Sequence, residues 1–458
     1  MLLFFGVVII YKIVLLFLFM KHQKRLSQKI ADYEFYPEVY LYPTPRTYTL
    51  LNDFSLYQAD FSKEINVYFH IPFCKQICTF CGYLKMIDSN GDLQEKYVSA
   101  LLSEIELYHT VLEDKIVKTL HFGGGTPSLL FSSQLERIIT ALIKINPKLL
   151  ETAEEVSIEA TPESVEKNKF VEYKNLGINR VSIGIESLQN SEIVLAGRHN
   201  LAAASLQAIT LLKEIGIANV VADLMIGIEG QTVLSFEKSV ITLLEYSPDT
   251  VEFYALGLMP QTRLGKFIPQ LISSREIYQC YTIGRDLFLN SGYVQDCHNR
   301  YVIPAKGSFL QEDYVWNGMS LVGFGAGVRS YAKNVHYRNA YSSIAAKKAI
   351  IEYINSMQEM KLNVQTGIFL NRDEKIRQYA IGNLECLSKK DFTFCFGEKF
   401  ENYFSNIYDD LLGLGLATDD NEVITLTEKG LLFRDLICSE FFSDTVQKLE
   451  EAYRPKKI

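Results

Sequence analysis

The sequence predicts an α/β fold: a partial (β/α)6 barrel followed by a C-terminal, mostly helical, winged-helix-like module. From Glu64 onward, six short β-rich runs alternate with longer segments of helical period, which is typical of parallel strands joined by helices. Near residue 290 this alternation stops. From about residue 365 the chain reads as helices followed by a short strand, a turn and a final helix.

The six predicted strands are rich in β-branched and aromatic residues. They span residues 65–71, 117–122, 155–160, 180–185, 219–227 and 250–256. Between them, segments such as residues 93–112 and 202–216 repeat apolar residues at i, i+3, i+4 and i+7, as helices that cover a sheet do. Because the carboxyl ends of parallel strands meet at one rim, we expect the functional groups there.

The pattern divides the chain into five segments. They are an apolar segment (1–24), an N-terminal extension (25–63), the core barrel (64–290), a substrate-side connection rich in glycine and aromatic residues (291–364) and the C-terminal module (365–458). The connection contains GFGAGVRSY at 323–331, but its glycine spacing differs from G-x-G-x-x-G and no clean strand–helix unit surrounds it. We therefore expect no nucleotide site in the connection.

Composition narrows the class of protein. The chain has 458 residues, of which 48% are hydrophobic and 22% charged, and its formal net charge is −8. This is ordinary globular usage, and nothing in it offers the basic face that nucleic acid requires. Outside one short loop, the cysteines are scattered singly among apolar residues, as buried, reduced cysteines of a cytoplasmic protein are.

Residues 2–20 form an apolar run that only Lys12 interrupts, and KHQKR follows it. As a helix this run would be about 28 Å long, close to the thickness of a bilayer core, and the basic residues would keep the following chain on the cytoplasmic side. A secretory signal fits less well because the preceding charge and the cleavage site are missing. Either the run is a membrane anchor, or the working protein starts at Met20.

Three cysteines fall within HIPFCKQICTFCGYLK, at Cys74, Cys78 and Cys81. Disulfides use cysteines in pairs, and a structural zinc ion usually has four ligands. A [4Fe–4S] cluster normally takes four thiolates, so three would leave one iron open to a further ligand. The alternative is a zinc ion with His70 as its fourth ligand.

Polar or glycine-rich features follow the other strands at the same end. GGGTPS (123–128) follows the second strand, Glu159 ends the third and Glu186 the fourth, Asp223 lies in the fifth, and Tyr254 lies near the end of the sixth. One such feature would be weak evidence, but all of them lie at the same end of successive strands, which predicts a shared site beside the cysteine loop.

C-x3-C-x2-C with Phe80 before the last cysteine resembles the radical S-adenosylmethionine (SAM) superfamily. The resemblance implies that SAM chelates the open iron of a [4Fe–4S] cluster. An electron from the cluster then cleaves SAM to methionine and a 5′-deoxyadenosyl radical, which abstracts hydrogen from a substrate. It also implies reduced flavodoxin or a ferredoxin-type protein as electron donor.

Several motifs look like those of the oxygen-independent coproporphyrinogen III oxidase group. They are VYFHIPFCKQICTFCGY, HFGGGTPSLL, SIEATPES, NRVSIGIESLQ, LAGRHN and DLMIGIEGQT. The similarity runs from about residue 42 to the C-terminal module. It implies a cytoplasmic oxidoreductase-type enzyme with a small-molecule substrate, for which a tetrapyrrole is one candidate. Relatives in this group bind two SAM molecules.

The resemblance also implies roles for individual residues. Cys74, Cys78 and Cys81 would hold the cluster, with Tyr68 and Phe80 packed around cluster and SAM. Gly124, Gly125 and Thr126 would approach the methionine part of SAM, and Glu159, Glu186, Arg198 and Asp223 would complete the cofactor site. Arg198 would pair with the SAM carboxylate. Taken alone, Arg198 would instead indicate a surface salt bridge, and Glu159 or Asp223 a cap or loop hydrogen bond.

The departures from the group concern the substrate. Tyr83 replaces a fourth cysteine, Glu186 replaces a glutamine, and residues 310–312 read Leu-Gln-Glu where haem chaperones have Arg-His-Asn ahead of Trp316. Residues 327–331 read GVRSY where Gly-Ala-His-Ser is usual. We therefore expect a radical SAM enzyme acting on an unidentified substrate. The alternatives are a true coproporphyrinogen III dehydrogenase, a methyl or methylene transferase and a haem-binding carrier.

Overall fold

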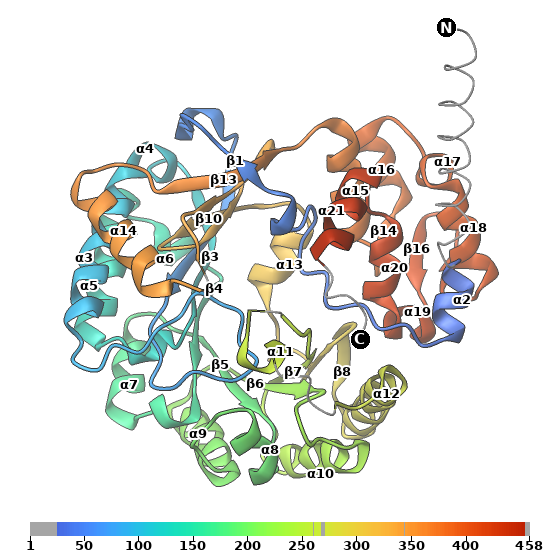
Figure 1. Cartoon of the computed structure of the whole chain (residues 1–458), viewed down its shortest axis with the longest axis horizontal. Helices are drawn as coiled ribbons and strands as arrows, with labels where there is room; N and C mark the ends of the chain where they lie inside the picture. The colour runs from blue at the N-terminus through green and yellow to red at the C-terminus, as the bar shows by residue number, and fades with distance from the viewer. Residues whose placement is uncertain (1–24, 260, 267–270, 343, 454–458) are drawn as a thin grey trace, which may run out of the picture.

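The computed structural model describes residues 25–259, 261–266, 271–342 and 344–453. A single curved sheet runs through most of the molecule, with helices on its outer side and a smaller domain beside it (Figure 1). Within the described residues the sheet has thirteen strands, in the order β1-β13-β12-β11-β10-β2-β3-β4-β5-β6-β7-β9-β8.

The six predicted strands are confirmed as the parallel centre of this sheet. They are β2 (Glu64–Ile71), β3 (Ile116–Gly124), β4 (Glu155–Ala160), β5 (Arg180–Glu186), β6 (Asn219–Ile226) and β7 (Thr250–Ala255). A seventh parallel strand, β10 (Ser320–Phe324), pairs with β2 from a distant part of the sequence. The barrel is therefore wider than the alternation alone predicts.

The chain after residue 290 does not leave the sheet but extends both of its edges with antiparallel strands. At one edge lie β8 (Val294–Cys297) and β9 (Arg300–Val302), and at the other lie β11 (Arg329–Tyr331), β12 (Val335–Asn339), β13 (Val364–Phe369) and β1 (Thr49–Leu50). These strands escape the sequence pattern because their runs are short and because no helix separates β8 from β9 or β11 from β12. GFGAGVRSY forms the end of β10, a turn and β11.

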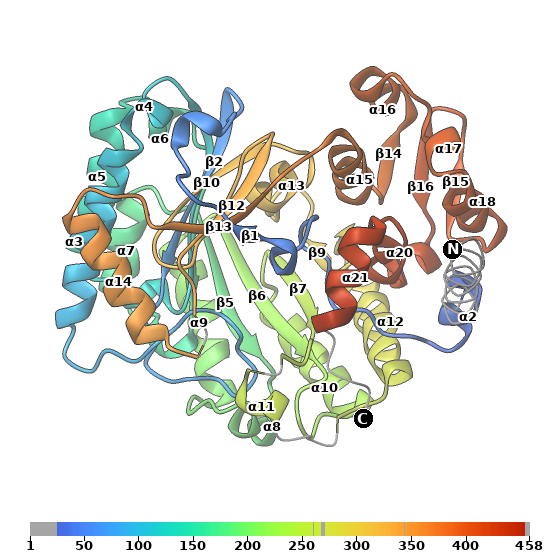
Figure 2. The same ribbon diagram turned by 45° about the horizontal axis from the view of Figure 1, so that its top comes forward.

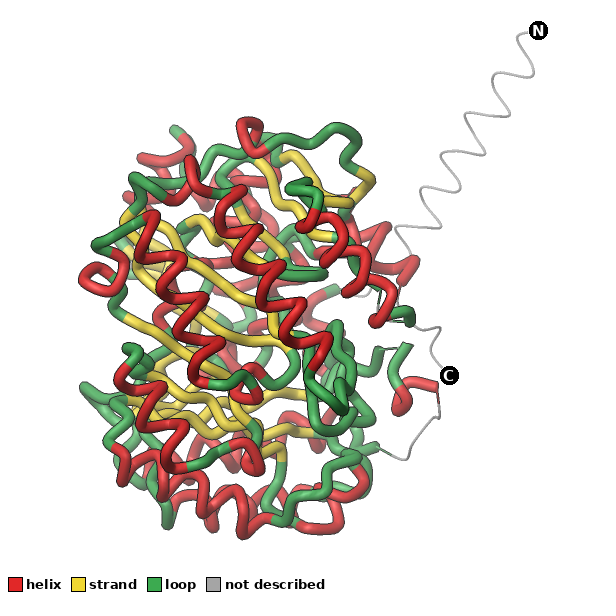
Figure 3. The backbone as a smooth tube through the Cα atoms, turned by 90° about the vertical axis from the view of Figure 1, so that its left-hand side faces the viewer, coloured by secondary structure: helices red, strands yellow, loops and turns green. Residues whose placement is uncertain are grey.

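Helices cover the outer face of the sheet (Figure 3). The covering helices include α3 (Asp92–Leu107), α5 (Ser132–Ile145), α7 (Lys167–Asn175), α9 (Ala202–Ile215), α10 (Val233–Leu244), α12 (Ser274–Asn290) and α14 (Ala346–Gln358). Shorter helices are α4 (His109–Leu112), α6 (Leu149–Thr152), α8 (Asn190–Leu195) and α11 (Arg263–Lys266). In contrast, α13 (Leu310–Trp316) lies on the inner side of the sheet, where Gln311 donates to Thr119 Oγ1 (3.3 Å). The predicted helix at 93–112 is interrupted at Tyr108, between α3 and α4.

Each parallel strand has one apolar and one largely polar face, although both are buried. In β2, Val67, Phe69 and Ile71 belong to the main hydrophobic core under the helices. Asn66 and Tyr68 face the other way, and the strand register places Thr119 and His121 beside them. Since side chains alternate along a strand, polar residues recur at every second position and line the inside of the barrel.

The C-terminal module confirms the winged-helix-like prediction (Figure 2). It contains α15 (Arg372–Gly382), α16 (Lys389–Phe396), α17 (Phe400–Tyr403) and α18 (Ser405–Gly413), with a three-stranded antiparallel sheet of β14 (Cys386–Ser388), β16 (Val423–Leu426) and β15 (Ala417–Asp419). Three helices end it, α19 (Glu428–Leu432), α20 (Arg434–Glu440) and α21 (Asp444–Tyr453). The short helix α2 (Leu26–Ala31) packs into the separate core of this module.

The predicted anchor at residues 2–20 lies outside the described residues. Among the helices that are described, none is both long enough and apolar enough to cross a membrane. The expectation that the scattered cysteines are all buried is wrong for two of them, because Cys386 and Cys395 are exposed. Both lie in the C-terminal module, where short amphipathic elements leave alternate positions open to solvent.

Candidate cofactor site

The cysteine loop leaves the carboxyl end of β2 and returns to it. The Cys74 N–H donates to Met86 O (2.9 Å) and the Met86 N–H donates to Pro72 O (2.8 Å), which closes the loop at its base. Cys74, Cys78 and Cys81 are free and half-buried. Burial raises the pKa of the Cys74 thiol to about 12, and it also raises the pKa of Cys78 and of Cys81. The loop thus offers three thiols that become ligands once they lose their protons.

The glycine run at the end of β3 (residues 123–125) packs directly against this loop. The Gly125 N–H donates to Ile71 O (2.9 Å) and the Thr126 N–H donates to Phe73 O (2.8 Å), so the run continues the pairing of β3 with β2. A Cβ atom on Gly124 would lie 2.5 Å from the His70 ring, and one on Gly125 would lie 2.8 Å from backbone oxygens. Glycine is therefore required here by the protein's own packing, whatever ligand approaches it.

Glu159 is the penultimate residue of β4 and lies beside the same glycine run. Its carboxylate accepts from the Gly124 N–H (2.9 Å) and contacts His121 Nε2 (3.2 Å). Burial on its own would raise the pKa of Glu159, but His121 and the Gly124 N–H outweigh it and hold that pKa below its usual range. The group is a fixed negative charge at the barrel mouth.

Glu186 and Arg198 form a buried ion pair, with Arg198 Nη2 2.5 Å from Glu186 Oε1. Arg198 Nη1 also donates to Gly184 O at 2.5 Å. Glu186 has a φ of 67°, unusual for a residue with a side chain. Burial favours the neutral form of Arg198, but Glu186 and the nearby Cys78 outweigh it and raise the Arg198 pKa. Arg198 is thus buried, and the surface salt bridge that this residue would indicate if taken alone is not what the structure shows.

Asp223 lies on β6, opposite Gly184 of β5. Ser182 Oγ donates to Asp223 Oδ2 (2.6 Å), while Oδ1 is buried without a partner among the described residues. Burial, helped by the Glu252 charge, raises the Asp223 pKa well above its usual range. An orphaned, buried carboxylate oxygen is a group that a ligand with a donor would satisfy.

The three aromatic residues singled out in the sequence, Tyr68, Phe80 and Tyr83, differ in how far they are exposed to solvent. The Tyr68 ring stacks on His121 with centroids 5.5 Å apart and its hydroxyl bonds His70 Nδ1 (3.3 Å). Phe80 lies in the loop and is half-buried. Tyr83, which stands where the group has a fourth cysteine, is 62% exposed. The structure therefore gathers Tyr68, Glu159 and the glycine run, and it gathers Cys78 with Glu186 and Arg198.

Sequence reasoning missed a network of buried ion pairs inside the barrel, which is built on Arg180 and Arg300. Arg180 Nη2 donates to Glu252 Oε1 (2.9 Å), and Arg180 also stacks 3.9 Å above the Phe309 ring. Arg300 Nη1 donates to Glu312 Oε2 (3.0 Å). The available signal was a polar residue at every second position of a strand, as at Glu155, Ser157 and Glu159 of β4.

The zinc alternative has little support in this geometry. His70 donates through Nε2 to Leu84 O (2.9 Å) and accepts from Tyr68 at Nδ1, so both ring nitrogens are engaged. Within the described residues, no three His, Cys, Asp or Glu side chains converge tightly enough for a single metal ion. A cluster with several irons instead needs its thiolates spread around it.

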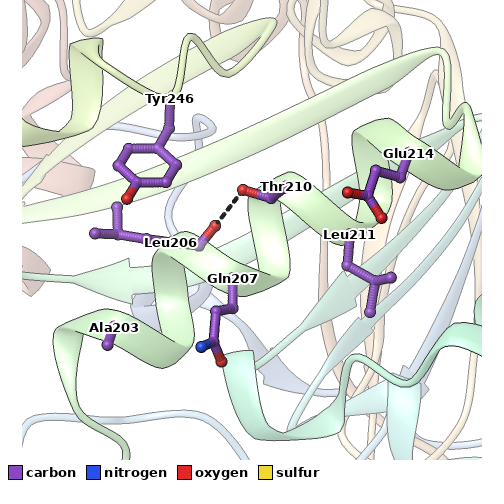
Figure 4. A pocket seen from close by; sticks show the side chains of 7 residues that line it. All are labelled: Ala203, Leu206, Gln207, Thr210, Leu211, Glu214 and Tyr246. Carbon is purple, nitrogen blue, oxygen red and sulfur yellow. Dashed lines mark hydrogen bonds between the residues drawn. The ribbon is translucent and has the colours of Figure 1, made fainter.

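A surface hollow on the outer helix layer is unrelated to this site. It is lined by one face of α9 together with Tyr246 (Figure 4). The Thr210 hydroxyl donates to Leu206 O within the helix, and Glu214 is the one carboxylate of the lining. None of the candidate cofactor residues lines this hollow.

Comparison with known proteins matches the site to a family. Residues 68–242 match the family model described as the radical SAM superfamily. The heme chaperone HemW of Lactococcus lactis is 26% identical over 394 residues, which cover 84% of this chain and 99% of that protein. HemW of Synechocystis is 30% identical over 295 residues, 60% of this chain and 69% of that protein.

Oxygen-independent coproporphyrinogen III oxidase of Pseudomonas aeruginosa is 25% identical over 402 residues, 82% of this chain and 85% of that protein. The solved structure of coproporphyrinogen III oxidase (HemN) from Escherichia coli has the same fold, with a TM-score of 0.78 and 24% identity over 90% of this chain and 98% of that one.

Fold and site together define a protein of the SAM-dependent iron–sulfur class, as the cysteine loop on a partial barrel indicated. The chain belongs to the radical SAM superfamily and, within it, to the oxygen-independent coproporphyrinogen III oxidase-like group. Members bind a [4Fe–4S] cluster and SAM. The residues present fit both groups, because three free thiols lie in one loop beside a buried arginine and an orphaned carboxylate oxygen.

Proposed function

We propose that this protein cleaves SAM reductively and uses the resulting radical on a small molecule held in the barrel. The observation that carries the proposal is the position of the cysteine loop. It closes at the carboxyl end of β2, on the same rim as Glu159, Arg198 and Asp223. A reduced [4Fe–4S] cluster bound there would supply the electron that converts SAM to methionine and a 5′-deoxyadenosyl radical.

The chain's own residues would hold and orient the two cofactors. Cys74, Cys78 and Cys81 would bind three irons, leaving the fourth open. The Glu159 carboxylate, kept ionised by His121 and the Gly124 N–H, can accept a hydrogen bond from the SAM amino group. Asp223 Oδ1, which lacks a partner among the described residues, can accept from a SAM hydroxyl.

The barrel interior below the rim suits a polar substrate. Tyr68, His121, Asp223 and Glu252 face it from neighbouring parallel strands. The proposed substrate is a small molecule, for which a tetrapyrrole is the leading candidate because relatives are named for coproporphyrinogen and heme. Residues 310–312, where haem chaperones have Arg-His-Asn, serve the fold instead. Gln311 donates to Val67 O (3.0 Å), and Glu312 binds Arg300. This favours the enzyme over a haem carrier.

The proposal is tested by reconstituting the protein anaerobically with iron and sulfide. We expect about four irons per chain and iron–sulfur absorption. Cys78→Ala should lose the cluster, whereas the matched control Cys386→Ala removes a free, exposed thiol of the C-terminal module and should keep it. Stoichiometric zinc without iron–sulfur absorption in anaerobically purified protein would refute the proposal. Titration with haem, if it bound one per chain without any SAM cleavage, would favour the carrier.

A further inference from the structure

Two arginines face each other across β11 and β12, on the barrel side of the sheet. Arg329 of β11 is the direct partner of Arg338 of β12 in the strand register. The neighbouring pair, Ser330 and Tyr337, points the opposite way, and Tyr337 lies in the helix-covered core. Like charges directly opposite each other on one face weaken a sheet. The fold therefore keeps an arrangement that costs stability in the isolated chain.

The arginines have no acidic partner among the described residues. Arg338 stacks on the Tyr341 ring, with its guanidinium carbon 3.4 Å from the centroid, and its Nε donates to Gly327 O (3.1 Å). The Arg329 guanidinium makes no hydrogen bond or ion pair with any residue that the structure describes, and it lies over the Tyr331 ring with its carbon 5.9 Å from the centroid. Both side chains are half-buried, so some of their surface is accessible.

The surroundings of the pair are aromatic and include an orphaned donor. Tyr48 Oη is buried without a hydrogen-bond partner within the described part of the chain. Burial raises its pKa, Tyr331 adds to the rise, and the charges of Arg329 and Arg338 oppose it. Burial also lowers the pKa of Arg338 to about 10, helped by repulsion from Arg329. Because arginine stays protonated in proteins, this positive charge persists without an acidic partner among the described residues.

The pair lies near the Cys81 end of the cysteine loop, whereas Arg198 lies near Cys78. The Tyr341 hydroxyl, whose ring carries Arg338, donates to Gly82 O (3.0 Å) next to Cys81. The Arg329 charge also acts on the pKa of Tyr68 and of Tyr83. In contrast, four strands, β10, β2, β3 and β4, separate β11 from β5, which carries Glu186. At the usual strand spacing this is roughly 24 Å along the sheet. The pair and Arg198 thus belong to strands far apart along the curved sheet, and each lies near a different cysteine of the loop.

We propose that Arg329 and Arg338 bind a carboxylate group of the substrate and hold that substrate beside the cysteine loop. The inference rests on the proposed function for the existence of a substrate. Two guanidinium groups present several N–H donors in one region, a geometry that matches the two oxygens of a carboxylate. The Tyr48 hydroxyl adds a third donor. The residue at 329 is also where this chain departs from the group's Gly-Ala-His-Ser motif.

The test is calorimetric titration of the cluster-loaded full chain with 1,3,5-benzenetricarboxylate, in the absence of SAM. We expect saturable binding that Arg329→Gln and Arg338→Gln each weaken at least tenfold. Lys333→Gln is the matched control, because it removes the same charge from the exposed turn between β11 and β12 and should leave the affinity unchanged. Iron content and iron–sulfur absorption, measured on every variant, show that the fold is intact.

Three results would overturn the inference. In the first, the wild-type chain gives no more heat with the tricarboxylate than with sodium chloride at equal ionic strength. In the second, the wild type and the three variants bind the tricarboxylate with equal affinity. In the third, inorganic phosphate binds as tightly as the tricarboxylate and depends on the same two arginines. The last would make the pair a general oxyanion site. Cleavage of SAM is measured separately, so failure of the proposed function would be seen on its own.

Discussion

Arg198 donates to the carboxylate of Glu186 across 2.5 Å, and both side chains are buried. The resemblance of the sequence to its group assigned Arg198 to the SAM carboxylate. The group usually has a glutamine where this chain has Glu186, and the Glu186 carboxylate already neutralises the charge of Arg198. The SAM carboxylate would therefore compete with Glu186 for one cation.

Replacing Glu186 with glutamine should tighten SAM binding. The substitution removes the competing negative charge and leaves Arg198 free to pair with the ligand, so we expect about tenfold higher affinity, or about 1.4 kcal/mol. Equilibrium binding of SAM to the cluster-loaded protein measures this. Glu214→Gln on the outer face of α9 makes the same charge change on an exposed residue and should have no effect. Weaker SAM binding in Glu186→Gln would show that the pair acts as a preorganised unit.

Replacing Arg198 with alanine should weaken SAM binding by about 2–4 kcal/mol, as breaking a hydrogen-bonded charge pair does. Glu186 is then left as a buried, unpaired carboxylate that repels the ligand. The double variant Arg198→Ala with Glu186→Gln should recover part of this loss. Equal SAM affinities in wild type and Arg198→Ala, with cluster content intact, would remove Arg198 from the cofactor site.

Gly124→Ala should destabilise the protein by about 2–4 kcal/mol, because it combines backbone strain with a steric clash. Gly124 has a φ of 114°, and the added Cβ atom would lie 2.5 Å from His70. Gly91→Ala is the control, since its φ is 78° but nothing lies within 4 Å of the added atom. It should cost about 1 kcal/mol. Urea unfolding compares the two, and equal losses would argue against a close-packed glycine run.

His70 should make stability depend on pH. Burial lowers its pKa from 6.5 to about 4. The unfolded chain binds the proton more readily, so the group's contribution of about 3 kcal/mol is present above pH 6.5 and is lost as the pH falls towards 4. Between pH 7.5 and pH 5, cluster-free wild type should lose about 2 kcal/mol more than His70→Gln in urea unfolding. Parallel losses in the two proteins would contradict a neutral, buried His70.

The centre of the sheet was predictable because its strands and helices alternate regularly along the chain. β10 was not, since it pairs with β2 across a long stretch of sequence, and the strands that flank it along the chain, β9 and β11, are short and antiparallel to their partners. The same limit applies to the site. Residues at strand ends could be expected to meet, because parallel strands share a rim. The facing of Arg329 and Arg338 depends on a hairpin register that no periodicity reveals.

The packing contacts of individual site residues could not be predicted from the sequence either. The glycines after β3 suggested an approach to a ligand, yet their closest contacts are His70, Glu159 and the backbone of the cysteine loop. The ion pair of Glu186 with Arg198 joins residues on either side of α8, at a position whose backbone adopts a positive φ. Such conformations follow from the assembled tertiary structure, so the sequence could nominate these residues but not their partners.

The most direct test of the account is mass spectrometry of SAM products from the anaerobically reconstituted protein with dithionite as reductant. The account predicts 5′-deoxyadenosine and methionine from wild type and from Cys386→Ala, and neither product from Cys78→Ala. Intact SAM after incubation with wild-type protein that carries a complete, reducible iron–sulfur cluster would contradict it.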